Sequence, residues 1–212
     1  MTFPHRLALV SAAALILAPV SAANILVNGG FEDQPNWGIN GDGGYTRLSG
    51  GEMPGWVIAD GHSVTVHREF GYPTISGNYS INMDGEGFND HNADFYQDFA
   101  TEAGHVYALE YDWSTWWFGT PVLGVQVINL ADSSLVVNDE HGWVEGGVHH
   151  ESIQFVGTGG AFRLRVLETF ESGINDNTFI VDNFQINEVP GPGVAAVLAC
   201  TGLMRSRRRP GR

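Results

Sequence analysis

The 212-residue chain contains no lysine, so all ten of its basic residues are arginines, against 24 aspartates and glutamates. The formal net charge of −14 at pH 7 repels phosphate backbones and argues against nucleic acid as a partner. The only cysteine, Cys200, excludes an internal disulfide and a cysteine-based zinc site.

The common catalytic motifs are also missing. The sequence has no Gly-x-Ser-x-Gly elbow, no His-Glu-x-x-His pair and no phosphate-binding glycine loop. A glycoside hydrolase needs two carboxylates beside the scissile bond, and an acidic chain always offers such pairs. We therefore predict a non-catalytic protein, with a glycan-active hydrolase as an alternative. The carboxylates that such an enzyme could use are Glu110, Asp112, Glu168 and Glu171.

The first 23 residues have the three parts of a secretory signal peptide. Arg6 supplies a positive charge, an apolar run follows over 7–17, and small residues occupy 20–23. The apolar run is shorter than the ~20 residues that span a bilayer, which argues against the alternative of a short membrane anchor. Residues 1–23 therefore predict export across the inner membrane.

The last 24 residues, 189–212, repeat this plan in reverse. A Val-Pro-Gly-Pro-Gly sequence at 189–193 precedes an apolar stretch at 194–204, and five of the last eight residues are arginines. The order is typical of a stop-transfer tail, although eleven apolar residues are few for a span. We expect a short apolar helix that associates transiently with the membrane.

These C-terminal residues resemble the PEP-CTERM sorting signal of Gram-negative bacteria. In this chain Gly191 stands where that signal usually has Glu. The resemblance implies an exosortase-type sorting enzyme as a partner and delivery to the cell surface. A plain tail anchor is the alternative.

Between these ends, residues 24–188 show the alternation of apolar and polar residues that is typical of β-strands. Turn sequences rich in glycine separate the runs, and no segment has a helical stripe. The pattern predicts one all-β domain, an antiparallel β-sandwich. The predicted strands are 25–27, 56–58, 62–67, 79–83, 95–100, 105–113, 122–128, 135–137, 152–156, 162–167 and 180–186.

Several phrases in this domain resemble galactose-binding-domain-like jelly rolls, which include many carbohydrate-binding modules. The phrases are Asn24–Glu32, 54–56, 96–107 and Val181–Phe184, and they occur in that order. The resemblance implies a two-sheet jelly roll, often with a structural calcium ion that ties the first strand to the last. The matching positions are Glu32 and Asp182. In phase with Ile180 and Phe184, Asp182 is expected to point inward, and hydrogen bonds from backbone N–H groups are the alternative to calcium.

Trp113, Trp116 and Trp117 form the densest aromatic group in the sequence. Trp113 is in phase with Tyr111 and is predicted to lie in the core. Trp116 and Trp117 could form a platform for the flat C–H face of a sugar, or could instead cap the core. We therefore predict an exported, surface-sorted protein that binds glycan or exopolysaccharide at Trp116 and Trp117. The alternative is a structural matrix or adhesion protein of the cell envelope without a small ligand.

Overall fold

The computed structural model describes residues 23–33, 44–68, 72–84, 93–116, 121–169 and 178–191. Residues 22–190 form one compact unit. The predicted signal peptide and C-terminal helix lie outside the described residues. Within the described ranges, no helix has the length and hydrophobicity that crossing a membrane requires.

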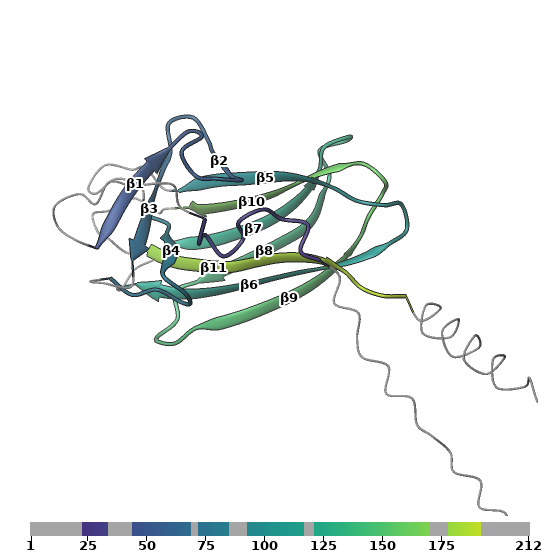
Figure 1. The fold of residues 1–212 in the computed structure, drawn as a ribbon. Coiled ribbons are helices and arrows are strands. Elements are labelled where there is room, and N and C mark those ends of the chain that lie inside the picture. The colour runs from purple at the N-terminus through teal and green to yellow at the C-terminus, as the bar shows by residue number, and fades with distance from the viewer. Residues whose placement is uncertain are drawn as a thin grey trace, which may run out of the picture. The chain divides into compact units, whose positions relative to one another are not determined.

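The described residues form two antiparallel sheets, which confirms the predicted all-β jelly-roll sandwich (Figure 1). The six-stranded sheet has the order β1-β3-β4-β11-β6-β9, and the five-stranded sheet has the order β2-β5-β10-β7-β8. The strands are β1 (Tyr45–Ser49), β2 (Val57–Ile58), β3 (Ser63–Arg68), β4 (Tyr79–Asn82), β5 (Asp94–Ala100), β6 (Val106–Trp116), β7 (Val122–Asn129), β8 (Leu135–Gly142), β9 (His149–Val156), β10 (Ala161–Thr169) and β11 (Thr178–Glu188).

The core lies between the sheets and follows the predicted alternation. Every second residue of β6 from Tyr107 to Trp113 is buried, and the same holds for β10 from Phe162 to Val166. Aromatic rings fill much of this space, and Tyr111 stacks on Phe184 with ring centroids 5.3 Å apart. Such pairs add roughly 0.5–1.5 kcal/mol beyond the area they bury.

The opening segment runs along the last strand. Ile25 N donates to Ile186 O at 3.0 Å, and Phe184 N donates to Gly29 O at 2.9 Å. Asn24 bonds β11 twice, since its Nδ2 donates to Phe184 O and its Oδ1 accepts from Ile186 N. This segment forms bends rather than the strand predicted at 25–27, but it does join the two ends of the domain.

A bulge in β11 changes which side chains face the core. The register shifts between Asp182 and Gln185, and Asn183 has a φ of 56°. Asp182 pairs with Asp112, on the outer face of the sheet, whereas Phe184 belongs to the core. The expectation that Asp182 shares the inner face with Phe184 is therefore wrong, because the bulge reverses the alternation, although its carboxylate is fully buried, against Ser76 and Ser80.

Candidate functional site: an aromatic cleft on the six-stranded sheet

A cleft of about 160 Å³ opens on the outer face of the six-stranded sheet. Its walls come from β1, β3 and β4, from the end of β6 and from the segment after β3. We refer to it as the aromatic cleft. Its lining residues are Tyr45, Arg47, Thr65, His67, Tyr72, Asn82, Asp84 and Trp116.

Strand register brings these side chains to one face. Tyr45 lies opposite His67, Arg47 opposite Thr65, and Thr65 opposite Asn82. Directly paired residues point to the same side of an antiparallel sheet, so alternate residues of three neighbouring strands form one surface. Their neighbours Val64, Val66 and Ile81 face the core.

Hydrogen bonds fix the floor of the aromatic cleft. Asp84 N donates to Asn82 Oδ1 at 2.8 Å, and Asn82 Nδ2 lies 2.8 Å from His67 Nε2. His67 Nδ1 lies 3.1 Å from Pro73 O. Because Nε2 faces the amide donor of Asn82 and Nδ1 faces the carbonyl of Pro73, the imidazole must accept at Nε2 and donate at Nδ1.

Burial keeps His67 neutral. Desolvation lowers the pKa of His67 to about 4, although the bond to Pro73 acts in the opposite direction. The floor therefore keeps one hydrogen-bonding pattern above pH ~4, with no charge on the imidazole.

Three aromatic side chains surround this histidine. The Tyr72 ring centroid is 5.0 Å from that of His67 at an interplanar angle of 37°, and Tyr45 meets Tyr72 edge-on at 5.3 Å. Trp116 approaches His67 edge-on at 5.9 Å. Tyr45, Tyr72 and Trp116 are only partly buried, so each presents ring surface at the cleft.

The structure thus places one of the two predicted tryptophans in the aromatic cleft. Trp116 ends β6 and lines the cleft, while Trp117 lies outside the described residues. Trp113 lies in the core, as predicted. The sequence reasoning missed Tyr45 and Tyr72. The available signal for Tyr45 was the alternation of Tyr45 and Arg47 with Leu48 in the short run that forms β1.

The two predicted calcium ligands bind opposite ends of one turn. The exposed Glu32 accepts hydrogen bonds from Asn78 N, Asn78 Nδ2 and Tyr79 N. Asp182 accepts from Ser76 N, Ser76 Oγ, Ser80 Oγ and Asn183 N. Backbone N–H groups reach both carboxylates, with an amide donor at Glu32 and two serine hydroxyls at Asp182. Hydrogen bonds from backbone N–H groups, the alternative to calcium, are therefore present at both residues.

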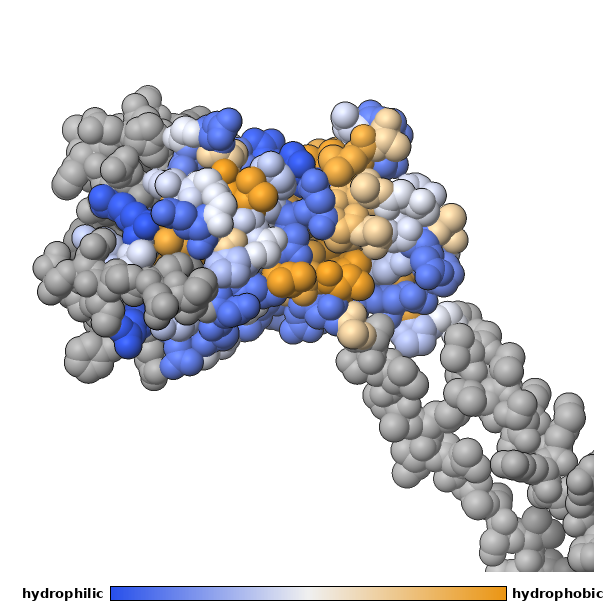
Figure 2. All heavy atoms as spheres, turned by 45° about the horizontal axis from the view of Figure 1, so that its top comes forward, coloured by the Kyte–Doolittle hydropathy of each residue, from blue (hydrophilic) through white to orange (hydrophobic). Residues whose placement is uncertain are grey.

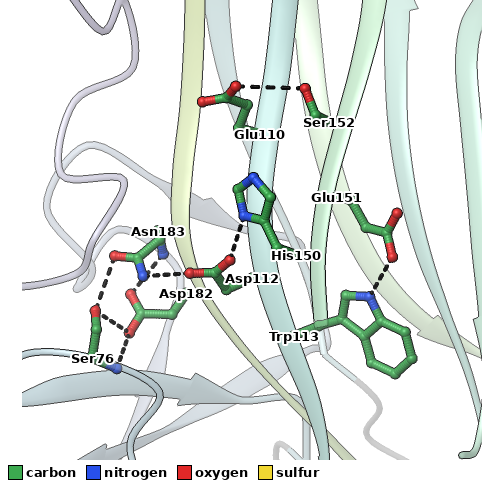
Figure 3. Close-up of polar contacts among 9 residues, drawn as sticks. All are labelled: Ser76, Glu110, Asp112, Trp113, His150, Glu151, Ser152, Asp182 and Asn183. Atoms are coloured by element: carbon green, nitrogen blue, oxygen red, sulfur yellow. Dashed lines mark hydrogen bonds and ion pairs between the residues drawn. The ribbon is translucent and has the colours of Figure 1, made fainter. Parts of the chain in front are cut away.

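Asp182 belongs to a polar network on the outer face of the sheet (Figure 3). Asn183 Nδ2 donates to Asp112 Oδ2 at 2.7 Å, and His150 Nδ1 lies 2.7 Å from Asp112 Oδ1. The bond to Asp112 raises the pKa of His150. Burial raises the pKa of Asp182 to about 7, although its hydrogen-bond donors act in the opposite direction.

Two of the carboxylates nominated for glycoside hydrolysis lie on different layers. Glu110 is on the outer face of the six-stranded sheet, beside Ser152, whereas Glu168 is buried on the inner face of the five-stranded sheet. The sandwich interior separates them, so they do not flank a common substrate. Asp112 belongs to the outer-face network, and Glu171 lies outside the described residues.

No family model and no curated protein matches the chain. Among solved structures, "Family 16 Carbohydrate Binding Module-2" has a TM-score of 0.50 and 16% identity, over 77% of this chain and 99% of its own. An arabinose-bound MgGH51 α-L-arabinofuranosidase has a TM-score of 0.50 and 9% identity, over 79% of this chain and 27% of its own. Identities this low establish shared architecture alone. The chain has the two-sheet jelly-roll fold, and its structural relatives include a carbohydrate-binding module.

Proposed function

We propose that the aromatic cleft binds carbohydrate. The observation that carries this proposal is the convergence of Tyr45, Tyr72 and Trp116 beside the polar side chains of Arg47 and Asp84. A sugar ring offers a flat C–H face to aromatic rings, and its hydroxyl groups bond to guanidinium and carboxylate groups. Polar residues outnumber the three aromatic ones in the lining, which gives the hydroxyl groups of a sugar several partners around the rings.

The dimensions favour one sugar unit inside the cleft. Its volume of about 160 Å³ lies below the ~300 Å³ at which pockets for larger ligands begin. The outer face continues from the cleft over β11 and β6 towards β9, where His150 is exposed and Asp112 partly exposed, while Asp182 is fully buried. A polysaccharide could place one unit in the cleft and neighbouring units along this face.

The floor supports binding because it is already ordered. The hydrogen bonds from Asp84 through Asn82 to His67 hold the cleft in one arrangement. A preorganised site loses less side-chain freedom on binding, which favours affinity. The jelly-roll similarity to a Family 16 carbohydrate-binding module supports the same ligand class.

A polysaccharide panel tests the proposal. We expect the chain to bind at least one glycan, and Trp116→Ala and Tyr72→Ala each to weaken that binding by about tenfold or more, since aromatic anchors contribute ~2 kcal/mol. Tyr96→Ala is the matched control, because Tyr96 is a half-buried aromatic residue on the five-stranded sheet, beside Arg163. Binding to no glycan, or equal losses in all three variants, would favour the structural matrix alternative.

We also propose that the C-terminal tail sorts the protein to the cell surface. The support is the order of motifs at 189–212, with apolar residues before an arginine cluster. Removal of 189–212 is expected to release the exported domain into the medium, measured by fractionating cells with a tagged domain. Unchanged surface retention would contradict this part of the proposal.

Calcium stays a prediction for the turn that Glu32 and Asp182 hold. If an ion stabilises that turn, a chelator lowers the melting temperature and added calcium restores it. An unchanged melting temperature in the chelator supports the hydrogen-bonded arrangement described above.

A further inference from the structure

We propose that Asp139, His141 and Glu151 form a binding site for a divalent first-row transition ion, of which Zn²⁺ is the best probe. The site lies at the open edge of the sandwich, apart from the aromatic cleft, and is independent of carbohydrate binding. Among the described residues, these three form the one His, Asp and Glu group whose ligand atoms lie within 4.8 Å of one another.

Strand order explains why the three side chains meet. β8 is the edge strand of the five-stranded sheet, and β9 is the edge strand of the six-stranded sheet. Asp139 and His141 are in phase with the buried Val137, and Glu151 lies opposite the buried Tyr111. All three therefore point into the seam between the sheets, two from one layer and one from the other.

The spacing suits a small ion. His141 Nε2 lies 3.1 Å from Asp139 Oδ2. Zinc bonds to nitrogen and oxygen are ~2.0–2.2 Å, so two ligands at the tetrahedral angle lie roughly 3.3–3.6 Å apart. The His141–Asp139 pair is already near this separation, and ligand atoms as far apart as 4.8 Å would have to approach by roughly 1.2–1.5 Å through side-chain rotation.

Buried donors from β6 orient both carboxylates. Tyr111 Oη donates to Asp139 Oδ2 at 2.6 Å, and Trp113 Nε1 donates to Glu151 Oε1 at 3.1 Å, as Figure 3 shows for the second pair. Supporting hydrogen bonds of this kind are a regular feature of metal ligands.

A further polar group lies in the same seam. The imidazoles of His141 and His149 both stack on Trp113, with centroid distances of 4.5 and 4.3 Å. His149 Nε2 is buried and has no hydrogen-bond partner in the described part of the chain. His149 is not one of the three converging ligands, but its stacking on Trp113 helps to fix the indole that orients Glu151.

The ligand types select the ion class. One imidazole with two carboxylates suits zinc and related first-row ions, whereas calcium and magnesium prefer oxygen ligands alone. His141 Nε2 lies within hydrogen-bond distance of Asp139 Oδ2 and Tyr111 Oη. The ion would displace any proton on that nitrogen and connect the edges of the two sheets.

Thermal melting of the intact chain with Zn²⁺ tests the site. We expect Zn²⁺ at about 100 µM to raise the melting temperature by roughly 4 °C or more. His141→Gln and Glu151→Gln should each remove most of this shift. The matched controls are His150→Gln and Glu140→Gln, which change neighbouring residues that point away from the seam and should keep it.

Titration calorimetry at room temperature separates binding from folding. Variants with native circular dichroism should bind Zn²⁺ at least tenfold more weakly if they lack His141 or Glu151. No Zn²⁺ binding by the native chain, equal losses in the controls, or tighter binding of Ca²⁺ than of Zn²⁺ would overturn the proposal.

Discussion

Glu168 is a carboxylic acid on the buried face of β10. It is in phase with the core residues Leu164 and Val166 of β10, and its Oε1 accepts a hydrogen bond from Phe179 N at 3.2 Å. Burial raises the pKa of Glu168 from 4.5 to about 8, so the folded protein holds this carboxyl protonated at neutral pH. Such a group stabilises the fold most when the unfolded chain is protonated as well.

The pH dependence of stability follows from that shift. Because the folded pKa lies above the unfolded one, the contribution of Glu168 is complete below pH 4.5 and is lost as the pH rises to about 8. Each pH unit in this window corresponds to ~1.4 kcal/mol. The free energy of unfolding of Glu168→Gln should therefore be about 2–4 kcal/mol higher than that of the native protein at pH 8. This difference should disappear towards pH 5.

Urea unfolding of both proteins across this pH range measures the difference. Glu102→Gln, which removes a well-exposed carboxylate, is the control and should give a much flatter difference. If the free energies of unfolding of Glu168→Gln and of the native protein differ by the same amount at every pH, the carboxyl titrates normally in the folded state.

At the scale of elements, the contact between the opening segment and β11 depends on close backbone approach. A Cβ at Gly29 would lie 1.9 Å from Phe184 O, the carbonyl that Asn24 binds. At Gly30, the nearest atom to an added Cβ is Asn183 Oδ1 at 3.7 Å, which is ordinary contact. The two neighbouring glycines therefore offer a matched pair.

Gly29→Ala is expected to reduce the free energy of unfolding by about 2–3 kcal/mol, because the segment must move away from β11. Gly30→Ala should change it by less than about 0.5 kcal/mol. Urea denaturation gives both values. Equal effects would show that the opening segment does not depend on this contact.

The strands show which elements the sequence could predict. Long runs such as β6 and β10 follow from alternation alone, since one side of each is continuously apolar. β1 was missed because it has Leu48 as its one buried residue, and its pairing with β3 is a long-range property. Similarly, both β8 and β9 are longer than predicted, because β8 ends in polar residues and β9 begins with them.

The aromatic cleft was predictable only in part, for the same reason. Trp116 stands out in a cluster of tryptophans, but Tyr45 and Tyr72 reach it through strand pairing and a connecting segment. The bulge at Asn183 likewise carries no apolar signature that a period of two could detect. The local alternation of apolar and polar residues therefore predicts the two sheets. The aromatic cleft depends on strand register, which that alternation does not contain.

At the scale of the whole molecule, charge is strongly one-sided. All 24 acidic residues lie within 24–188, where Arg47, Arg68, Arg163 and Arg165 are the only basic residues, so the domain has a formal charge of −20. Arg163 and Arg165 already pair with Asp98 and Asp94. Much of the surface in Figure 2 is hydrophilic, with apolar patches between polar side chains. Self-repulsion of this size opposes the compact state.

Salt should therefore stabilise the domain. Raising NaCl from about 0.01 to about 1 M shortens the Debye length from about 30 to about 3 Å, and we expect the melting temperature to rise by several degrees. The same series at a pH near ~4, where carboxylates are partly protonated, serves as the control and should show a smaller rise. A melting temperature that falls with salt at neutral pH would contradict the repulsion argument.

Both ends of the described domain lie at the same end of the sandwich. Val189 N donates to Val106 O, and Ile25 N donates to Ile186 O, so both ends of the domain leave beside the start of β6. Trp116 is ten residues further along that strand, about 33 Å away at ~3.3 Å per residue. In Figure 1 the end of β11 and the strands of the aromatic cleft lie at opposite poles. Any fusion or tether joined to either end of the described domain would therefore be attached about one strand length from the cleft.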